Sequence, residues 1–172
     1  MKKRAWITLA LAGLLLMAAV PAAARSPVTD FVTISYVCEQ GDPFAEWITD
    51  DGVVHQRGII LHNEYRSDEP RVTGSELGYG HMDVDLNIGN ISTWGYTTLV
   101  TSEGTWFTEM TGEITAEGAS SYLTGYGGDG LEGYFISWRG RQLSPPYENP
   151  PCEPVMVLEM TGRIRPGKGP RP

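Results

Sequence analysis

The apolar residues beyond residue 24 occur in short runs, and this pattern restricts the fold more than any other feature of the sequence. Val, Ile, Thr, Tyr, Phe and Trp recur in runs that Gly and Pro interrupt, and no stretch of ten or more residues has the spacing of an amphipathic helix. The pattern predicts an all-β fold. We expect about eight strands, over 31–38, 53–65, 80–89, 92–101, 104–118, 119–127, 133–142 and 154–164.

The strand expected over 80–89 shows the clearest alternation. Successive residues of a strand point to opposite faces, so this segment separates an apolar face from a polar one. The apolar face carries Met82, Val84, Leu86 and Ile88. The polar face carries His81, Asp83, Asp85 and Asn87. We expect the first set to be buried and the second to face solvent or a ligand.

The first 24 residues have the layout of a secretory signal peptide. Lys2, Lys3 and Arg4 precede an apolar run that ends in small residues, and cleavage after Ala24 fits best. The sequence therefore predicts a signal peptide over 1–24, a β-barrel domain over 25–165 and a flexible tail over 166–172. We expect a secreted or periplasmic protein.

Two cysteines follow the signal segment, Cys38 and Cys152. In an exported chain an even pair indicates a disulfide, which here would join the end of the first strand to the start of the last. Bringing the two ends of a sheet together suits a closed antiparallel barrel of about eight strands. A two-sheet β-sandwich is the alternative.

The charge of the expected mature chain is strongly negative. Removal of three positive residues with the signal leaves 10 Lys and Arg against 21 Asp and Glu, a formal charge of −11. Phosphate backbones and anionic lipid surfaces repel such a chain, so we expect neither nucleic-acid binding nor membrane binding after signal cleavage.

Two segments share the pattern Glu-Met-Thr-Gly-x-Ile, "FTEMTGEI" at 107–114 and "VLEMTGRI" at 157–164. We interpret them as two barrel strands with the same packing, in which the glycine allows the sheet to bend. The bulky residues in one phase of these strands predict a filled interior there, and any cavity toward the opposite end of the barrel. These residues are Trp106, Met110, Met156, Leu158 and Met160.

The stretch "TGYGGDGLEGYFISW", residues 124–138, contains the pattern GxGxxG twice. A dinucleotide site requires a strand before the glycines and a helix after them, because the helix N-terminus binds the pyrophosphate. Here a strand follows, and Asp129 and Glu132 would repel phosphate. The glycines therefore predict a tight turn between strands, and we expect no cofactor.

The segment "GYGGDGLEGYFISW", with the preceding "FTEMTGEITAEG", resembles the glycine-rich late strands of the allene oxide cyclase and dirigent-like barrels. In those families a GxGxxxG-type stretch leads into a strand, with a somewhat different spacing. The resemblance covers about thirty residues and implies an eight-stranded barrel with a hydrophobic lumen. No catalytic position of those families matches a residue here, so the resemblance implies no activity.

His81, Asp83 and Asp85 are the candidate catalytic residues. Spaced by two on a strand, they lie on one face with Cα atoms about 6.5 to 7 Å apart. If that face lined the lumen, the two carboxyls would form an acid and base pair beside His81. The alternative is that all three are solvent-facing residues of a half-buried strand, which we favour. No His or Cys pair has metal spacing, so we expect no metal site.

Aromatic residues could form the floor of a ligand cavity, and these are Trp94, Tyr96, Trp106, Phe135 and Trp138, of which Trp94, Tyr96 and Trp138 are the candidate ligand-binding residues. Core packing is the commoner use of such residues. We favour a non-catalytic protein that binds a small apolar ligand or a partner surface. The alternatives are an enzyme of the cyclase or isomerase type that uses lumenal carboxylates, and a structural envelope protein. The sequence specifies neither the ligand nor an oligomeric state.

Overall fold

The computed structural model describes residues 28–167, so the predicted signal peptide and all but the first two residues of the predicted tail lie outside the described part. These described residues form nine strands and one short 3-10 helix, η1 (Pro70–Val72). The strands are β1 (Thr29–Gln40), β2 (Ala45–Ile48), β3 (Val53–Arg66), β4 (Gly74–Asp85), β5 (Asn90–Thr101), β6 (Thr105–Thr115), β7 (Gly118–Gly128), β8 (Tyr134–Gln142) and β9 (Met156–Pro166).

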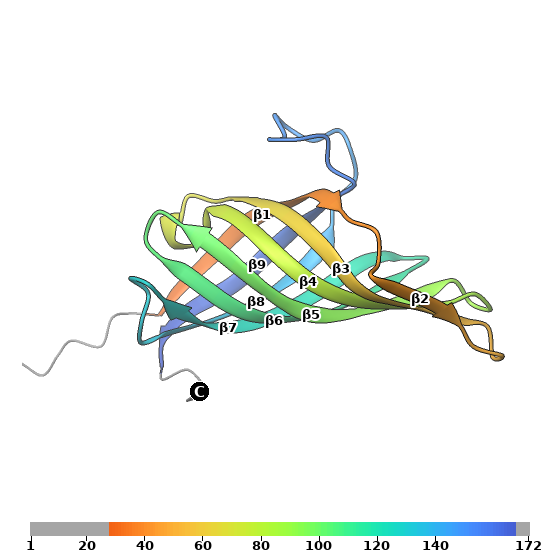
Figure 1. Cartoon of the computed structure of the whole chain (residues 1–172). Helices are drawn as coiled ribbons and strands as arrows, with labels where there is room; N and C mark the ends of the chain where they lie inside the picture. Colours follow the sequence, from red (N-terminus) through yellow and green to blue (C-terminus); the bar gives the residue numbers. More distant parts are fainter. Residues whose placement is uncertain (1–27, 168–172) are drawn as a thin grey trace, which may run out of the picture.

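Eight of the strands close into an antiparallel barrel (Figure 1). Neighbours along the sheet follow the order β1-β9-β8-β7-β6-β5-β4-β3, and the pairing of β1 with β3 completes the ring. The predicted eight-stranded barrel is confirmed, and the sandwich alternative is wrong. The ninth strand, β2, was not predicted; it pairs only with β3 and lies outside the ring.

The strand predicted over 80–89 begins earlier and ends earlier than expected. It is the second half of β4, which stops at Asp85, so Leu86 and Ile88 lie in the following turn and are 58% and 67% exposed. The side chain of Asp85 accepts a hydrogen bond from the Asn87 amide at 2.8 Å, which bends the chain as Asp and Asn commonly do. The prediction that Leu86 and Ile88 are buried is therefore wrong.

One end of the barrel, which we call the closed end, is filled by side chains. Here the β3–β4, β5–β6 and β7–β8 turns meet, and fully buried apolar residues from these turns and from the adjoining strand ends form one cluster. Its members include Phe31, Val72, Leu99, Trp106, Leu131, Ile136 and Ile164. The indole Nε1 of Trp106 donates to the carbonyl of Arg71 at 2.6 Å, which fixes the β3–β4 turn across the barrel end.

The glycine-rich stretch is the β7–β8 turn, and it places Leu131 in this cluster with only 2% of its surface exposed. Gly130 and Gly133 have positive φ angles of 110° and 83°, which a residue with a side chain adopts only with strain. A Cβ atom at Gly127 would collide with the carbonyl of Leu131. The glycines therefore allow the turn to fold tightly over the barrel and bury one leucine.

The other end, which we call the open end, carries the β4–β5 and β6–β7 turns and the proline-rich loop 143–155. The predicted disulfide between Cys38 and Cys152 is confirmed and ties this loop to β1, with a Cα–Cα distance of 5.7 Å. Backbone hydrogen bonds from Val155 to Val37 and from Leu143 to Val157 hold the two ends of the loop. The loop therefore leaves the mouth of the barrel on one side, as Figure 1 shows.

Candidate functional site

A cavity of about 100 Å³ occupies the half of the lumen nearer the open end. Its lining includes exposed residues, Gln40, Glu113 and Ser120, so it reaches the surface of the barrel. Most of the wall is aliphatic or thioether. The four methionines that follow the predicted signal segment all line it, and these are Met82, Met110, Met156 and Met160.

The prediction that the methionine-rich part of the interior is filled is therefore wrong, except at Trp106, which is packed in the closed end. Small residues explain the space. Gly112, Ser121 and Gly140 pair in one row across β6, β7 and β8, and Met160 follows on β9. A Cβ atom at Gly140 would collide with the Met160 sulfur, so the missing side chains make room for the methionine and leave a cavity beside it.

The floor of the cavity is polar and is centred on Glu76 of β4, which is 1% exposed. Its Oε1 accepts hydrogen bonds from Asn63 Nδ2 at 2.7 Å and Tyr65 Oη at 3.2 Å. Its Oε2 accepts one from Thr97 Oγ1 at 2.7 Å, and Thr97 in turn lies 2.6 Å from Thr108 Oγ1. The carboxyl is therefore held in a fixed position by strands β3 and β5.

The electrostatics of this floor are unusual because no Lys, Arg or His among residues 28–167 pairs with the carboxyl. Burial raises the pKa of Glu76 above its ordinary value, while hydrogen bonds from Thr97, Asn63 and Tyr65 act in the opposite direction. Burial, and next the nearby Glu76 charge, raises the pKa of Tyr65 well above its ordinary value, so this hydroxyl stays a donor.

Asn63 contributes the second distinctive feature of the floor. The residue is 6% exposed and lines the cavity. Its Nδ2 donates to Glu76, but its Oδ1 is buried and has no hydrogen-bond partner among the described residues. Buried amide oxygens are nearly always paired in folded proteins, because an unpaired one costs on the order of 1–3 kcal/mol. The floor thus contains an acceptor that lacks a donor.

Sequence reasoning missed Glu76. The strand was expected to begin at 80, so residues 75–79 were assigned to no element. The signal that would have found it is the alternation itself, because Glu76 shares the phase of the inward-facing Met82. Extending that phase four more residues toward the N-terminus, through Gly78, would have predicted a buried carboxyl in the lumen.

The predicted catalytic residues His81, Asp83 and Asp85 lie on the outer face of β4, opposite to Met82. Their side chains do not share a site. Asp83 accepts from Arg57 Nη1 at 2.8 Å and lies 2.7 Å from His55 Nδ1. Burial raises the pKa of Asp83, but the hydrogen bonds from Arg57 and His55 outweigh this effect and the pKa is lowered.

The remaining two members of that set have separate neighbours. The His81 ring lies between Tyr79 and Trp94, with centroid distances of 5.5 and 5.6 Å, and its Nδ1 accepts weakly from the Gly58 amide. Asp85 fixes the β4–β5 turn, as described above. No lumenal group consisting of a histidine and two carboxylates exists in the described barrel, so this basis for an enzyme is absent.

Thr49, His55 and Asp83 form a chain of hydroxyl, imidazole and carboxylate on the outside of the barrel. Thr49 Oγ1 lies 3.4 Å from His55 Nε2, in the order found in hydrolase triads. However, the Thr49 hydroxyl donates to Asp51 Oδ1 at 2.5 Å, so its proton is not directed to the imidazole. The Asp83 carboxylate also forms an ion pair with Arg57. The chain therefore fixes the β2–β3 turn.

The predicted ligand-binding aromatics lie on two faces of the sheet. Trp94 points outward and packs against the Arg57 guanidinium, 4.7 Å from the ring centroid, and Tyr96 is 64% exposed on the same face. Trp138 points inward, is 1% exposed and does not line the cavity. It packs edge-on against Phe31 and stacks on Tyr65, each at 5.6 Å. The three residues do not form one site.

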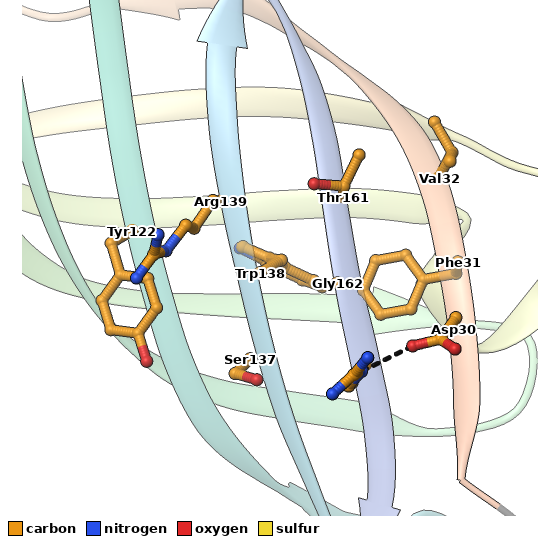
Figure 2. A pocket seen from close by; sticks show the side chains of 10 residues that line it. Asp30, Phe31, Val32, Tyr122, Ser137, Trp138, Arg139, Thr161 and Gly162 are labelled. Atoms are coloured by element: carbon orange, nitrogen blue, oxygen red, sulfur yellow. Dashed lines mark hydrogen bonds and ion pairs between the residues drawn. The ribbon is translucent and has the colours of Figure 1, made fainter.

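A shallow hollow on the outside of the barrel crosses β8, β9 and β1 around Gly162 (Figure 2). Its lining includes Tyr122 and Arg139, together with the ion pair between Arg163 and Asp30 at 2.6 Å. Both partners of this pair are largely exposed, and exposed pairs contribute little energy. The hollow is open surface, whereas the lumen cavity has walls on most sides.

Within residues 28–167, no three His, Cys, Asp or Glu side chains come together in a way that could hold a metal ion. The same residues include no helix with the length and apolar character needed to span a membrane.

Comparison with protein-family models, with curated proteins and with solved structures gives no match for this chain. The resemblance of the glycine-rich stretch to the allene oxide cyclase and dirigent-like barrels therefore stays a prediction.

Proposed function

We propose that this protein is an exported, single-domain barrel that binds a small, mainly apolar ligand in the lumen cavity without transforming it. One observation carries the proposal: a lumen that is packed at the closed end contains a methionine-lined cavity toward the open end. Natural barrels of eight strands have interiors that are either filled by side chains or large enough for one small ligand. In this barrel one half of the interior is filled by side chains and the other half contains the cavity.

The size of the cavity limits the ligand. A cavity of about 150 Å³ lined by apolar side chains binds benzene, so a volume of about 100 Å³ corresponds to on the order of four carbon atoms. Methionine side chains have three rotatable bonds and adapt to irregular shapes, which favours a site that accepts several related small molecules. The ligand is therefore a short chain, or the end of a longer one that protrudes through the mouth.

Binding is preferred over catalysis because of how the lumenal polar groups are arranged. The enzyme alternative relied on His81, Asp83 and Asp85, which lie outside the lumen. Glu76 has a raised pKa, as many catalytic acids have, but three donors occupy its oxygens and no second acid or base faces it within the described floor. The group is suited to holding a ligand.

Export is part of the proposal. The layout of residues 1–24 and the disulfide between Cys38 and Cys152 both support it, because disulfides persist mainly in oxidising compartments. The acidic composition supports a protein that keeps away from nucleic acid and anionic membranes. Edman sequencing or intact mass of the exported protein would test the cleavage site after Ala24.

The binding proposal is tested with methionine as the reporter. The oxidised mature protein, labelled with ¹³C at the methionine methyl groups, is titrated with xenon and with 1-butanol while its NMR signals are recorded. We expect saturable shifts, because all four methyl groups belong to methionines that line the cavity. A ligand at about 100 times its Kd should also add about 2.7 kcal/mol to the free energy of unfolding.

Two variants, each of which introduces a leucine, provide the control. Ala119→Leu adds carbon atoms inside the cavity lining and should abolish the shifts. Val32→Leu adds carbon on the exposed outer face and should leave them unchanged. If neither probe shifts the wild-type signals in a saturable way, the binding proposal is wrong and the structural envelope protein is favoured.

A further inference from the structure

Two polar groups of the cavity floor remain able to accept hydrogen bonds from a ligand. Asn63, Tyr65 and Thr97 each donate one hydrogen bond to the Glu76 carboxyl. What is left over is a carboxyl without a cationic partner and the Asn63 Oδ1, which has no donor among the described residues. A ligand that satisfies this floor must bring hydrogen-bond donors, and a positive charge would pair with the carboxylate.

The charges on the wall and at the mouth of the cavity also favour a cationic ligand. No Lys, Arg or His is among the residues that line the cavity, and its titratable groups are Tyr65, Glu76 and Glu113. Glu113 is exposed at the mouth. The expected charge of −11 on the mature chain adds a field that attracts cations and repels carboxylates. Anionic ligands are therefore excluded on electrostatic grounds.

We propose that the ligand is a small primary amine with a short apolar chain, bound as its ammonium ion. This assignment rests on the binding function proposed above and names its ligand class. The ammonium group carries three N–H donors, enough for Glu76 and the Asn63 Oδ1 together, whereas a hydroxyl has only one. The chain lies against the methionines and Leu158. An alkylammonium resembles the Lys side chain, whose pKa is about 10.4, so it stays charged at pH 8.

Binding of the ammonium ion is linked to release of a proton. Burial raises the pKa of Glu76, so its neutral carboxylic acid persists to a higher pH than that of an exposed glutamate. At a pH where Glu76 is protonated, binding of the ammonium ion transfers this proton to water, and the carboxylate remains paired with the ligand. The affinity for the amine therefore rises as the pH rises through the titration range of Glu76, and it becomes constant above that range. A neutral alcohol of the same shape shows no such rise.

The test compares butylamine with 1-butanol, which have the same four-carbon chain and differ in the headgroup. The labelled mature protein is titrated with each at pH 5, 6, 7 and 8, and the methionine methyl signals report binding. At pH 8 we expect butylamine to bind at least tenfold more tightly than 1-butanol, and this preference to shrink toward pH 5. The wild-type protein alone supplies this result, so it does not depend on the folding of a variant.

Two substitutions that each remove one acidic group locate the effect. Glu76→Gln should remove the preference for the amine, while Glu109→Gln, at an exposed position of β6 that does not line the cavity, should retain it. If 1-butanol binds as tightly as butylamine at pH 8, or if the preference survives in Glu76→Gln, the amine assignment is wrong although the binding function stands. If neither molecule shifts the methyl signals, both proposals are wrong.

Discussion

Leu131 is the side chain by which the glycine-rich turn contributes to the closed end, and its replacement by alanine tests that interpretation. The side chain is 2% exposed and belongs to the same buried cluster as Trp106 and Ile136. Removal of a buried leucine to alanine costs about 2.7 to 5.0 kcal/mol, with the cost set by how far the surroundings relax. Leu131 lies on a turn, so we expect partial collapse and a loss of about 3 kcal/mol.

The assay is urea unfolding of the oxidised mature protein, followed by tryptophan fluorescence. Trp106 and Trp138 are both buried and report the loss of the core. For a domain of this size a loss of about 3 kcal/mol corresponds to a fall in Tm of roughly 6 to 12 °C. Leu86→Ala is the matched control, because Leu86 lies in an exposed turn at the other end, and it should change stability by less than about 0.5 kcal/mol. A loss below about 1 kcal/mol for Leu131→Ala, or equal losses for the two variants, would refute the closed end as described.

Three further predictions concern the same barrel. Gly127→Ala should lower stability by about 1–3 kcal/mol, because its Cβ would collide with the Leu131 carbonyl, and the unfolding midpoint in urea measures this. Reduction of the disulfide, which spans 114 residues, should cost about 4–5 kcal/mol in the same assay; no change in midpoint would contradict it. Asp83→Asn should destabilise the protein at pH 7, and the difference from wild type should vanish in acid. The lowered pKa means that this contribution is present above about pH 4 and is lost as the pH falls through the pKa of the folded state.

The barrel could be predicted from the sequence because its determinants are local. Short runs of β-branched and aromatic residues set the strands, and glycine and proline set most of the turns. Cys38 and Cys152 supplied one long-range constraint, and it was the one that suited closure. The strand β2 was missed because Ala45–Ile48 is short and exposed along its whole length, so it carries no buried alternating face.

The site was harder to predict because it depends on register between strands that are distant in sequence. The alternation over 80–85 correctly placed Met82 and Asp83 on opposite faces of the strand. It does not show that Asp83 contacts Arg57 of the neighbouring strand β3. That contact depends on the irregular pairing at Gly58, which shifts the register of β3 by one residue. Likewise, the sequence alone suggests that the methionines fill the core. Only the strand pairing shows that Gly112 and Gly140 lie in the neighbouring strands and leave space there.

Glu76 marks the place where this barrel departs from what stability alone favours. A carboxyl at this depth carries a desolvation cost even with three hydrogen bonds, and an apolar side chain of similar volume would avoid that cost. The unpaired Asn63 Oδ1 adds a second cost in the same few ångströms of the floor. The well-packed closed end and the disulfide can offset both costs. Polar groups that cost stability and lie together at the base of a cavity are a local departure from the packing rules of the kind that functional sites commonly show, and they support the binding function proposed above.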